Sequence, residues 1–447
     1  MSALKRFRSE YTLSLLFLAY FFASISRFVI TAFVEPIKHD LVLSDVRISV
    51  LLGFAFSTSY VIGALPFGYL SDRISRKNLI AGGIAFWSVA CMASGFAHSF
   101  DQLFWTRMAT GAGEAVLMPA TFSLMRDLFP PKRLARAMGF FVSAAPLGSG
   151  ASLLFGATAL SVMANTATRS ALGLGGLAPW QAAYVLVGVP GVVLALIFFL
   201  TTTEPARGGQ RAEAGVDGAP ARSGYDDNVA PNWMLYAAII VTGMFVAMFG
   251  FAFKGWIPSY LTRSHGLSVP HAGLYYGLIT VFVSPIGTIL SGFICDGLQR
   301  RDIGQAPARL LRFCFAAAIP AAAIAFLLPS TGIALTGIVL LTLAYSMQIP
   351  LAPLVLQLTS PKRLIGRTTG IYLVVYNFLG ASIGPLSVAS LASLAAFQPI
   401  GRALFANSVL AAVLGLASTS FAYWAWRGTR PSPDGAAKIP VRSTEHA

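Results

Sequence analysis

One apolar segment ends in Gly68-Tyr69-Leu70-Ser71-Asp72-Arg73-Ile74-Ser75-Arg76-Lys77, and 224 positions later another ends in Gly292-Phe293-Ile294-Cys295-Asp296-Gly297-Leu298-Gln299-Arg300-Arg301. The tetrapeptide Pro-Lys-Arg-Leu at 131–134 returns at 361–364, a spacing of 230. Because two separate motifs repeat at nearly the same spacing, most of the chain is a duplication. An internal repeat in a membrane protein is typical of transporters that bind their substrate between the halves.

The composition places the chain in a lipid bilayer. Hydrophobic residues make up 56% of the 447 positions, charged residues make up 11%, and the mean hydropathy is +0.70. Soluble proteins of this length are far more polar. The apolar stretches reach about 20 residues, which is the length at which a helix crosses a hydrocarbon core of about 30 Å. Twelve spans are expected, at residues 12–34, 46–70, 78–97, 102–124, 137–160, 180–201, 233–258, 271–295, 310–328, 332–356, 367–394 and 403–426.

The positive charges are distributed unevenly between the two sides of the membrane. If the chain starts inside, the inner segments hold 24 of the 32 Lys and Arg residues and the outer loops hold five. This asymmetry follows the positive-inside rule, so we expect a multi-pass protein of the cell (inner) membrane with both termini in the cytoplasm. The net charge of +15 reflects this topology, and no nucleic-acid partner is expected.

The spans predict an all-α membrane protein of twelve transmembrane helices in two pseudo-symmetric six-helix bundles. The predicted domains are an N-terminal bundle at 1–201, a cytoplasmic linker at 202–232, a C-terminal bundle at 233–426 and a cytoplasmic tail at 427–447. The linker is rich in Gly, Ala, Pro, Arg and Asp without apolar periodicity, so it is expected to be flexible, and the tail is expected to be disordered. We expect a monomer.

Few side chains at membrane depth can carry out chemistry. Cys91, Cys295 and Cys314 form no CxxC pattern, and the five His residues fall in outer loops or the tail, so no disulfide framework or metal site is expected. The pattern GxxxxGK[ST] does not occur in the sequence, which argues against ATP as the energy source. We therefore expect no enzyme activity and no cofactor.

Glu114 is the only acid expected deep inside a span. A charge at mid-bilayer costs about 2.5–3.5 kcal/mol on insertion scales, so Glu114 should face a partner or a watered cavity. Arg107, Gly111 and Glu114 share one helical face, and Arg27 in the first span lies at a depth from which it could reach Glu114. Glu114 carries a coupling proton in one interpretation and half of a fixed ion pair in the other.

The charges at membrane depth favour an anionic substrate. Arg27, Arg107 and Lys254 stand against Glu114 alone. In the alternative interpretation, Arg107 and Lys254 lie near the outer ends of their helices and extend to the membrane surface, which leaves a neutral pair of Arg27 and Glu114.

The second half offers aromatic and amide side chains in place of acids. A cavity that is charged on one wall and aromatic on the other would suit an amphiphile with a polar head and an apolar body, although each of these residues could also serve only to pack helices. The predicted cavity residues are Ser26, Tyr60, Met248, Lys254, Tyr276, Tyr345, Gln348, Tyr376 and Asn377.

A cytoplasmic gate is expected where the repeated decapeptides lie. Arg76 could bridge Asp72 and Asp127, and Asp72 could also meet the positive end of the eleventh helix near Gly366, in contacts that form only while the inner side is shut. The alternative is a static surface ion pair worth about 0–1 kcal/mol. The predicted gate residues are Gly68, Asp72, Arg73, Arg76, Lys77, Asp127, Asp296 and Arg300.

These motifs resemble those of a known family. The decapeptide at 68–77 is similar to the loop signature of the major facilitator superfamily, G-x-L-A-D-R-x-G-R-K, with Ser75 in place of the second Gly. More narrowly, the chain resembles the bacterial Spinster-like branch in Val-Glu-Pro-Ile-Lys at 34–38, Leu-Ser-Asp at 43–45, Gly-Ala-Gly-Glu-Ala at 111–115 and Asp-Leu-Phe-Pro-Pro at 127–131.

The resemblance implies a secondary carrier that works by alternating access. It implies roles for Arg27 and Glu114, and in eukaryotic members the cargo is a lysolipid or a sphingoid phosphate. Members often have an Asp immediately before this Arg, where the chain has Ser26, so proton coupling rests on Glu114. We expect a proton-linked transporter of an amphiphilic or anionic, lysolipid-like molecule. The alternatives are a symporter of organic acids such as hexuronates and an uncoupled facilitator.

Overall fold

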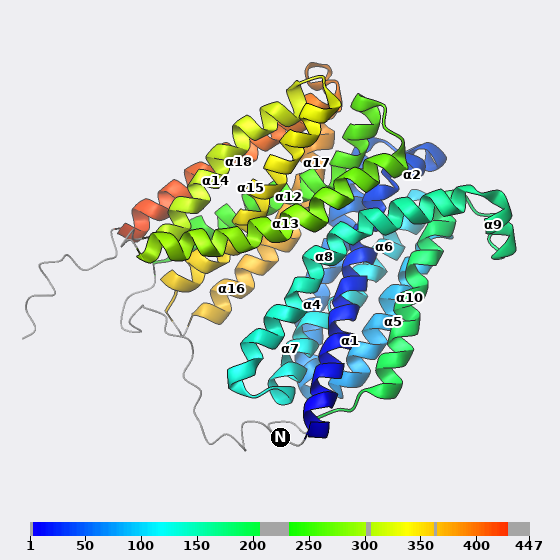
Figure 1. The fold of residues 1–447 in the computed structure, drawn as a ribbon, viewed down its shortest axis with the longest axis horizontal. Coiled ribbons are helices and arrows are strands. Elements are labelled where there is room, and N and C mark those ends of the chain that lie inside the picture. The colour runs from blue at the N-terminus through cyan, green and yellow to red at the C-terminus, as the bar shows by residue number, and fades with distance from the viewer. Residues whose placement is uncertain (1–2, 206–231, 301–304, 362–363, 428–447) are drawn as a thin grey trace, which may run out of the picture.

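The computed structural model describes residues 3–205, 232–300, 305–361 and 364–427. The described chain is almost entirely helical, and its long helices form two bundles (Figure 1). The expected linker at 206–231 and the expected tail at 428–447 lie outside the described residues.

The N-terminal bundle consists of α1 (Ala3–Phe28), α4 (Ala55–Arg73), α5 (Arg76–Ser94), α6 (Phe100–Glu114), α7 (Leu117–Leu128), α8 (Pro131–Ala164) and α10 (Pro179–Thr201). The C-terminal bundle consists of α12 (Trp233–His265), α13 (Val269–Arg300), α14 (Ala306–Leu327), α15 (Thr331–Thr359), α16 (Ile365–Val374), α17 (Ala381–Ala392) and α18 (Ile400–Arg427). Shorter segments are η1 (Val29–Ala32), α2 (Val34–Leu41), α3 (Asp45–Ser49), η2 (Val50–Phe54), α9 (Thr166–Ala171), η3 (Val375–Gly380) and η4 (Ala395–Phe397).

Ten of the described helical segments are long and apolar enough to cross a membrane. The predicted third and fourth spans are not among them; α5 and the pair α6–α7 occupy their places in the bundle. The expected span at 102–124 is covered by two helices, because α6 ends at Glu114 and α7 begins at Leu117. At this break the amide of Val116 donates to the carbonyl of Gly113, a tighter turn than an α-helix makes.

Serine and asparagine side chains set several helix starts. Ser44 accepts from the amide of Arg47 at the start of α3, Ser75 from Asn78 at α5, and Asn232 from Leu235 at α12. Each side-chain oxygen satisfies an amide that has no partner within its own helix. Ser75 thus starts α5 at the position where the related motifs have glycine.

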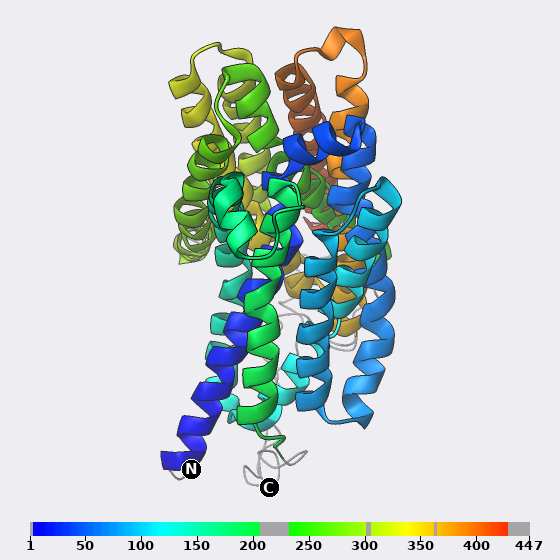
Figure 2. The ribbon, with the colours of Figure 1, turned by 90° about the vertical axis from the view of Figure 1, so that its right-hand side faces the viewer.

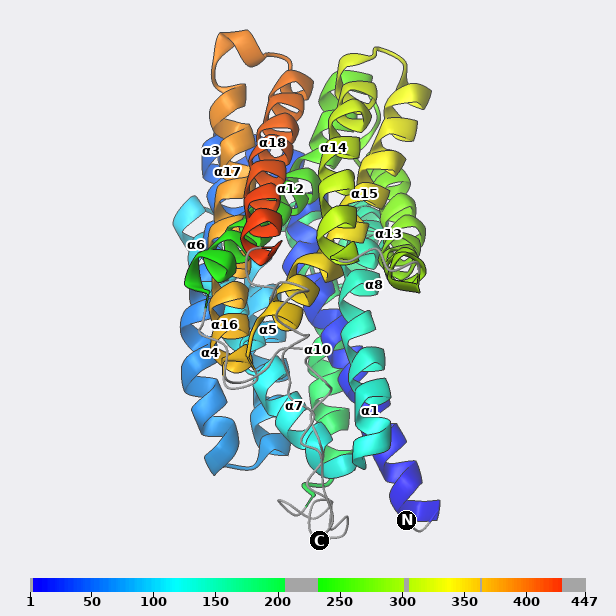
Figure 3. The same cartoon turned by 90° about the vertical axis from the view of Figure 1, so that its left-hand side faces the viewer.

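The two ends of the bundles differ in the residues that they carry. The basic end carries Arg73, Arg76, Arg126 and residues 202–205, and the far end carries α2, α9 and η4. Figure 2 looks onto the N-terminal bundle with the basic end at the bottom, and Figure 3 looks onto the C-terminal bundle, where α17 and α18 run side by side.

The space around individual glycines shows how closely the two bundles approach each other. Towards the far end, a Cβ added to Gly53 would lie 2.0 Å from the carbonyl oxygen of Ala381, and one added to Gly277 would lie 2.7 Å from Leu154. At the basic end of the same helices, Gly68 on α4 and Gly292 on α13 have nothing within 4 Å of such a Cβ. The bundles are therefore packed together towards the far end and separate towards the basic end, as the diverging helices α8 and α13 show in Figure 1.

Candidate functional site

Arg107 on α6 holds the end of α1. Its guanidinium is 1% exposed and donates to the carbonyl oxygens of Ser26 at 3.1 Å and Arg27 at 2.8 Å. The last carbonyls of a helix have no intrahelical donor and carry a partial negative charge, so a buried cation stabilises them. The interpretation in which Arg107 extends to the membrane surface is therefore wrong, because its partners are backbone groups inside the bundle.

Arg27 lies against aromatic rings. Its Cζ atom is 4.5 Å from the ring centre of Phe56, 5.4 Å from Phe28 and Phe251, and 5.5 Å from Tyr60. Phe251 belongs to α12, so this half-buried cation reaches across to the C-terminal bundle. Within the described ranges, no ion pair joins Arg27 to Glu114, and the fixed-pair interpretation is not realised in this conformation.

Glu114 is the last residue of α6, directly before the break. Its side chain is 5% exposed, and its Oε1 atom has no hydrogen-bond partner in the part of the chain that the structure describes. A buried carboxylate is costly unless it is paired or hydrogen-bonded. Among the described residues, Glu114 therefore lacks, in this conformation, the partner that a buried charge requires.

Lys254 lies in the interior, on α12. Its Nζ atom is 5.1 Å from the ring centre of Phe28 on α1 and 5.7 Å from that of Tyr345 on α15. The interpretation that places Lys254 at an outer helix end is wrong, because the lysine side chain lies over the same Phe28 ring as Arg27. The C-terminal half thus contributes a cation to the interface between the bundles.

Arg27, Lys254 and the aromatic rings around them form a cluster at the interface between the bundles. Some predicted cavity residues belong to this cluster and others do not. Lys254 lies over Phe28, and Tyr376 packs against Phe251. The ring of Tyr60 lies beside Arg27, and that of Tyr345 lies beside Lys254. The remaining predicted residues lie elsewhere.

Ser26 is buried beneath Arg107, and Met248 packs its backbone against Gly384. Tyr276 stacks edge-on against Phe253 inside the C-terminal bundle. Gln348 is fully buried with no partner for its amide among the described residues, and Asn377 donates to Leu373 of its own helix. Helix packing, the alternative interpretation, fits Ser26, Met248 and Tyr276, but it does not account for the amide of Gln348, which is unpartnered among the described residues.

Three phenylalanines of the cluster were not predicted. Phe28 follows Arg27 directly, Phe251 precedes Lys254 by one helical turn, and Phe56 lies one turn before Tyr60. An aromatic residue next to, or one turn away from, a cation inside a span is the sequence signal that could have identified Phe28 and Phe251. Phe56 carries no such signal.

At the basic end, Arg76 forms a network within the N-terminal bundle. Its guanidinium donates to Asp127, to Glu204 at 2.8 Å and to the carbonyl of Ser123 at 3.0 Å. Burial disfavours the charged guanidinium, but the hydrogen bonds that it donates to the two carboxylates outweigh burial and raise the pKa of Arg76. The network is intact while the bundles are apart at this end, so it is not a contact that forms only on closure.

The other predicted gate residues are separate in this conformation. Asp72 and Asp296 are exposed, and Arg73 lies 4.1 Å from the ring centre of Tyr69 on its own helix. Lys77 donates its backbone amide to Glu204, and the side chain of Arg300 lies outside the described part of the chain. Glu204, expected to begin a flexible linker, is instead held at the start of α5.

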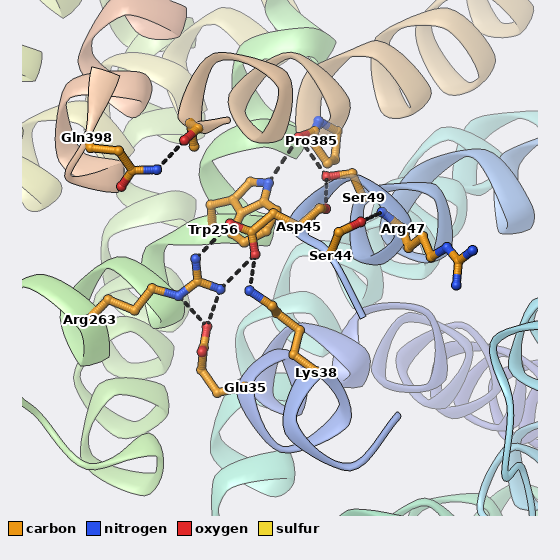
Figure 4. A network of polar contacts seen from close by, with 11 residues as sticks. Glu35, Lys38, Ser44, Asp45, Arg47, Ser49, Trp256, Arg263, Pro385 and Gln398 are labelled. Carbon is orange, nitrogen blue, oxygen red and sulfur yellow. Dashed lines mark hydrogen bonds and ion pairs between the residues drawn. The ribbon is translucent and has the colours of Figure 1, made fainter. Parts of the chain in front are cut away.

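The far end carries an ion-pair network between the bundles (Figure 4). Arg263 of α12 donates to both carboxylate oxygens of Asp45 at 2.8 and 2.9 Å and to Glu35 at 2.9 Å. Lys38 also contacts Asp45. In the sequence, Glu35, Lys38 and Asp45 lie in one expected outer loop and Arg263 lies in another. Only their opposite charges indicate that they could meet.

Two further contacts at the far end converge on one carbonyl. The oxygen of Pro385 accepts from Trp256 at 3.0 Å, within the C-terminal bundle, and from Ser49 at 2.9 Å, across from α3 (Figure 4). The carbonyl of Pro385 on α17 therefore joins both bundles at this point.

This geometry combines two helical bundles, packed at one end and apart at the other, with titratable side chains where they meet. Residues 16–385 match the sequence profile of the Major Facilitator Superfamily. The chain belongs to this superfamily. The expected fold class and the resemblance are confirmed, and the protein is a multi-pass membrane transporter, not an enzyme.

Solved superfamily structures share the whole fold. The chain matches a bacterial homolog of the human lysosomal transporter Spinster in an inward-facing and occupied conformation, with a TM-score of 0.81 and 25% identity over 95% of this chain and 99% of that one. A D-xylose–proton symporter, with a TM-score of 0.67 and 16% identity over 90% and 96%, shares the fold.

Relatives by sequence carry several descriptions. An MFS-type efflux pump of Mycolicibacterium smegmatis is 28% identical over 90% of this chain and 88% of its own length. A probable L-galactonate transporter of Escherichia coli is 26% identical over 69% and 66%. Protein spinster homolog 1 of Mus musculus is 29% identical over 62% of this chain, and the match spans about half (52%) of that relative.

Proposed function

We propose that this superfamily member is a secondary carrier that moves an organic anion by alternating access, with the anionic group bound beside Arg27. The observation that carries the proposal is the position of Arg27, a half-buried cation at the interface of the bundles that contacts rings from both and pairs with no acid among the described residues. An anionic group can supply the countercharge that the protein does not.

The proposed orientation places the basic end in the cytoplasm of a cell (inner) membrane. The positive-inside asymmetry supports it. The likeness to a structure described as inward-facing fits a cavity that opens towards the same end. The far-end network of Arg263, Asp45 and Glu35 then closes the outer side, and release and rebinding of substrate take place from the cytoplasm.

An amphiphile with an anionic head is the substrate class that the cluster favours. Phe28, Phe56, Phe251 and Tyr376 offer apolar faces around the cation, and such faces suit an apolar body. The resemblance to the Spinster-like branch implies a lipid-like cargo, and relatives named spinster homologs are among the sequences that the chain matches.

A small organic acid is a second candidate, favoured by Lys254. Recognition of a hydroxylated acid needs a cation from the C-terminal half, and Lys254 supplies one over the Phe28 ring. Relatives described as galactonate and galactarate/D-glucarate transporters fit this candidate.

Glu114 is proposed to carry the coupling proton. Its buried oxygen has no partner among the described residues in this conformation, and ionisation would require water or a cation to reach it. A carrier that lacks this coupling would be a facilitator.

Uptake into proteoliposomes tests the proposal. Oleoyl lysophosphatidate and galactonate represent the two candidates, each measured with and without an imposed pH gradient. Accumulation of either anion supports the carrier, and the probe that is taken up selects the class. Uptake that ignores the pH gradient would contradict proton coupling, and uptake of neither anion would contradict the proposed function.

A further inference from the structure

Each bundle places a cationic side chain against an aromatic ring of the other bundle. Arg27 of α1 lies over Phe251 of α12 at 5.4 Å, and Lys254 of α12 lies over Phe28 of α1 at 5.1 Å. Between them the rings of Phe28 and Phe251 stack, with centres 6.1 Å apart and an interplanar angle of 28°. Each bundle therefore places one cation against the aromatic ring of the other.

Neither cation has an acid partner in the described ranges. Lys254 makes no hydrogen bond or ion pair there. Its Nζ atom is 5.7 Å from the ring centre of Tyr345. The phenylalanine rings attract both cations through their π faces but offer no acceptor atom to three ammonium protons or five guanidinium donors. Two partly buried cations that share one ring also repel each other, because the local dielectric is lower than that of water.

We infer that Lys254 is a second substrate-binding cation and that the charged head of the substrate is held jointly by Lys254 and Arg27, one from each bundle. The inference rests on the proposed function and narrows its substrate class. The head group must carry at least two anionic oxygens in a compact arrangement, as a carboxylate or a phosphate does, so that one oxygen can face each cation.

This division of the binding site gives the substrate a mechanical role. Without an anion, the two cations on facing bundles repel. With an anion between them, both are attracted to the same group, and the bundles gain an interaction that neither half makes alone. A neutral analogue engages neither cation and gives no such gain. Discrimination between an anion and its neutral counterpart should therefore depend on Lys254 as well as on Arg27.

The test uses the full chain in proteoliposomes and two matched pairs of probes. Oleoyl lysophosphatidate is compared with neutral monooleoylglycerol, which lacks the phosphate, and galactonate with neutral galactitol. The variants are K254M, which keeps the length but removes the charge, and K254R, which keeps the charge. The control is R402Q, which removes an exposed cation at the far end of α18.

We expect K254M to raise the KM for the transported anion at least 10-fold and to leave transport of its neutral counterpart unchanged. K254R and R402Q should stay within about threefold of wild type. K254M removes no hydrogen bond among the described residues, so the melting temperature of this variant should match that of the wild-type protein. This measurement separates a binding defect from misfolding.

Two outcomes overturn the inference in distinguishable ways. Anion uptake by wild type that K254M leaves unchanged would overturn the role of Lys254 and spare the carrier. Failure of the wild-type protein to take up either anion would overturn the proposed function and the inference with it.

Discussion

Arg263 on α12 binds both carboxylate oxygens of Asp45 on α3, at 2.8 and 2.9 Å, and so fastens one bundle to the other at the far end. A bidentate arginine–carboxylate pair is stronger and more directional than a single contact between charged groups. Both side chains are largely shielded, with exposures of 25% and 21%, so solvent screens the pair only partly. The pair therefore stabilises the conformation that is closed at the far end.

Removal of this pair should open the far end. We expect R263Q to increase the population open at the far end about 5- to 30-fold, the change that corresponds to a loss of about 1–2 kcal/mol. Spin labels at Val42 and Arg402, both exposed at the far end of opposite bundles, report the change as longer distances by double electron–electron resonance.

The matched control for this experiment is R47Q. Arg47 lies at the same end, but its guanidinium contacts only the ring of Phe100, at 5.7 Å, and it joins no ion pair among the described residues. An identical distance distribution in R263Q and wild type would mean that the ion pair does not hold the bundles together.

Glu114 should govern pH dependence without supporting the fold. E114Q keeps the shape of the side chain and removes its proton exchange, so we expect transport to lose its response to an imposed pH gradient. Because Oε1 has no hydrogen-bond partner to lose, the melting temperature should stay equal or rise. Uptake with and without the gradient, together with thermal unfolding, checks both statements. Unchanged transport and unchanged pH dependence in E114Q would dismiss the coupling role.

Arg107 and Arg27 should separate stability from transport. R107M leaves the carbonyls of Ser26 and Arg27 without donors inside the bundle, so we expect it to lose about 1.5–3 kcal/mol of stability for each charged hydrogen bond. R27M gives up ring contacts and, among the described residues, no side-chain hydrogen bond, so it should abolish anion uptake with a near-normal melting temperature. Thermal unfolding and uptake of both variants check the contrast. Equal loss of stability in the two would contradict the assignment of Arg107 as the residue that holds α1.

The sequence predicts the architecture well because hydropathy and the internal repeat are properties of single segments. It identifies Arg27, Glu114 and Lys254 for the same reason, since a charge inside an apolar stretch is visible without a structure. It could not assign their partners. Arg107 binds backbone carbonyls that exist as free acceptors only because α1 ends at Phe28, and no residue type marks that end.

The depth and rotation of a helix are also set by tertiary packing. Lys254 lies close to the outer end of the expected span at 233–258, yet α12 extends to His265, which moves Lys254 into the interior. Glu204 is polar and follows the last apolar residue, so composition assigns it to a linker. Its contact with Arg76 depends on how α10 ends beside α5, which is a property of the assembled bundle.

Gly53 should be intolerant of a side chain, because closure at the far end brings two backbones together there. A Cβ at position 53 would lie 2.0 Å from the carbonyl oxygen of Ala381 on the other bundle, and backbone cannot move aside as a flexible side chain can. We expect G53A to prevent complete closure, to lengthen the distance between labels at Val42 and Arg402 as R263Q does, and to reduce transport at least 10-fold. The matched control is G82A on α5, where a Cβ meets nothing within 4 Å and alanine favours the helix. Transport by G53A equal to that of G82A would show that the backbones do not need to approach this closely during the cycle.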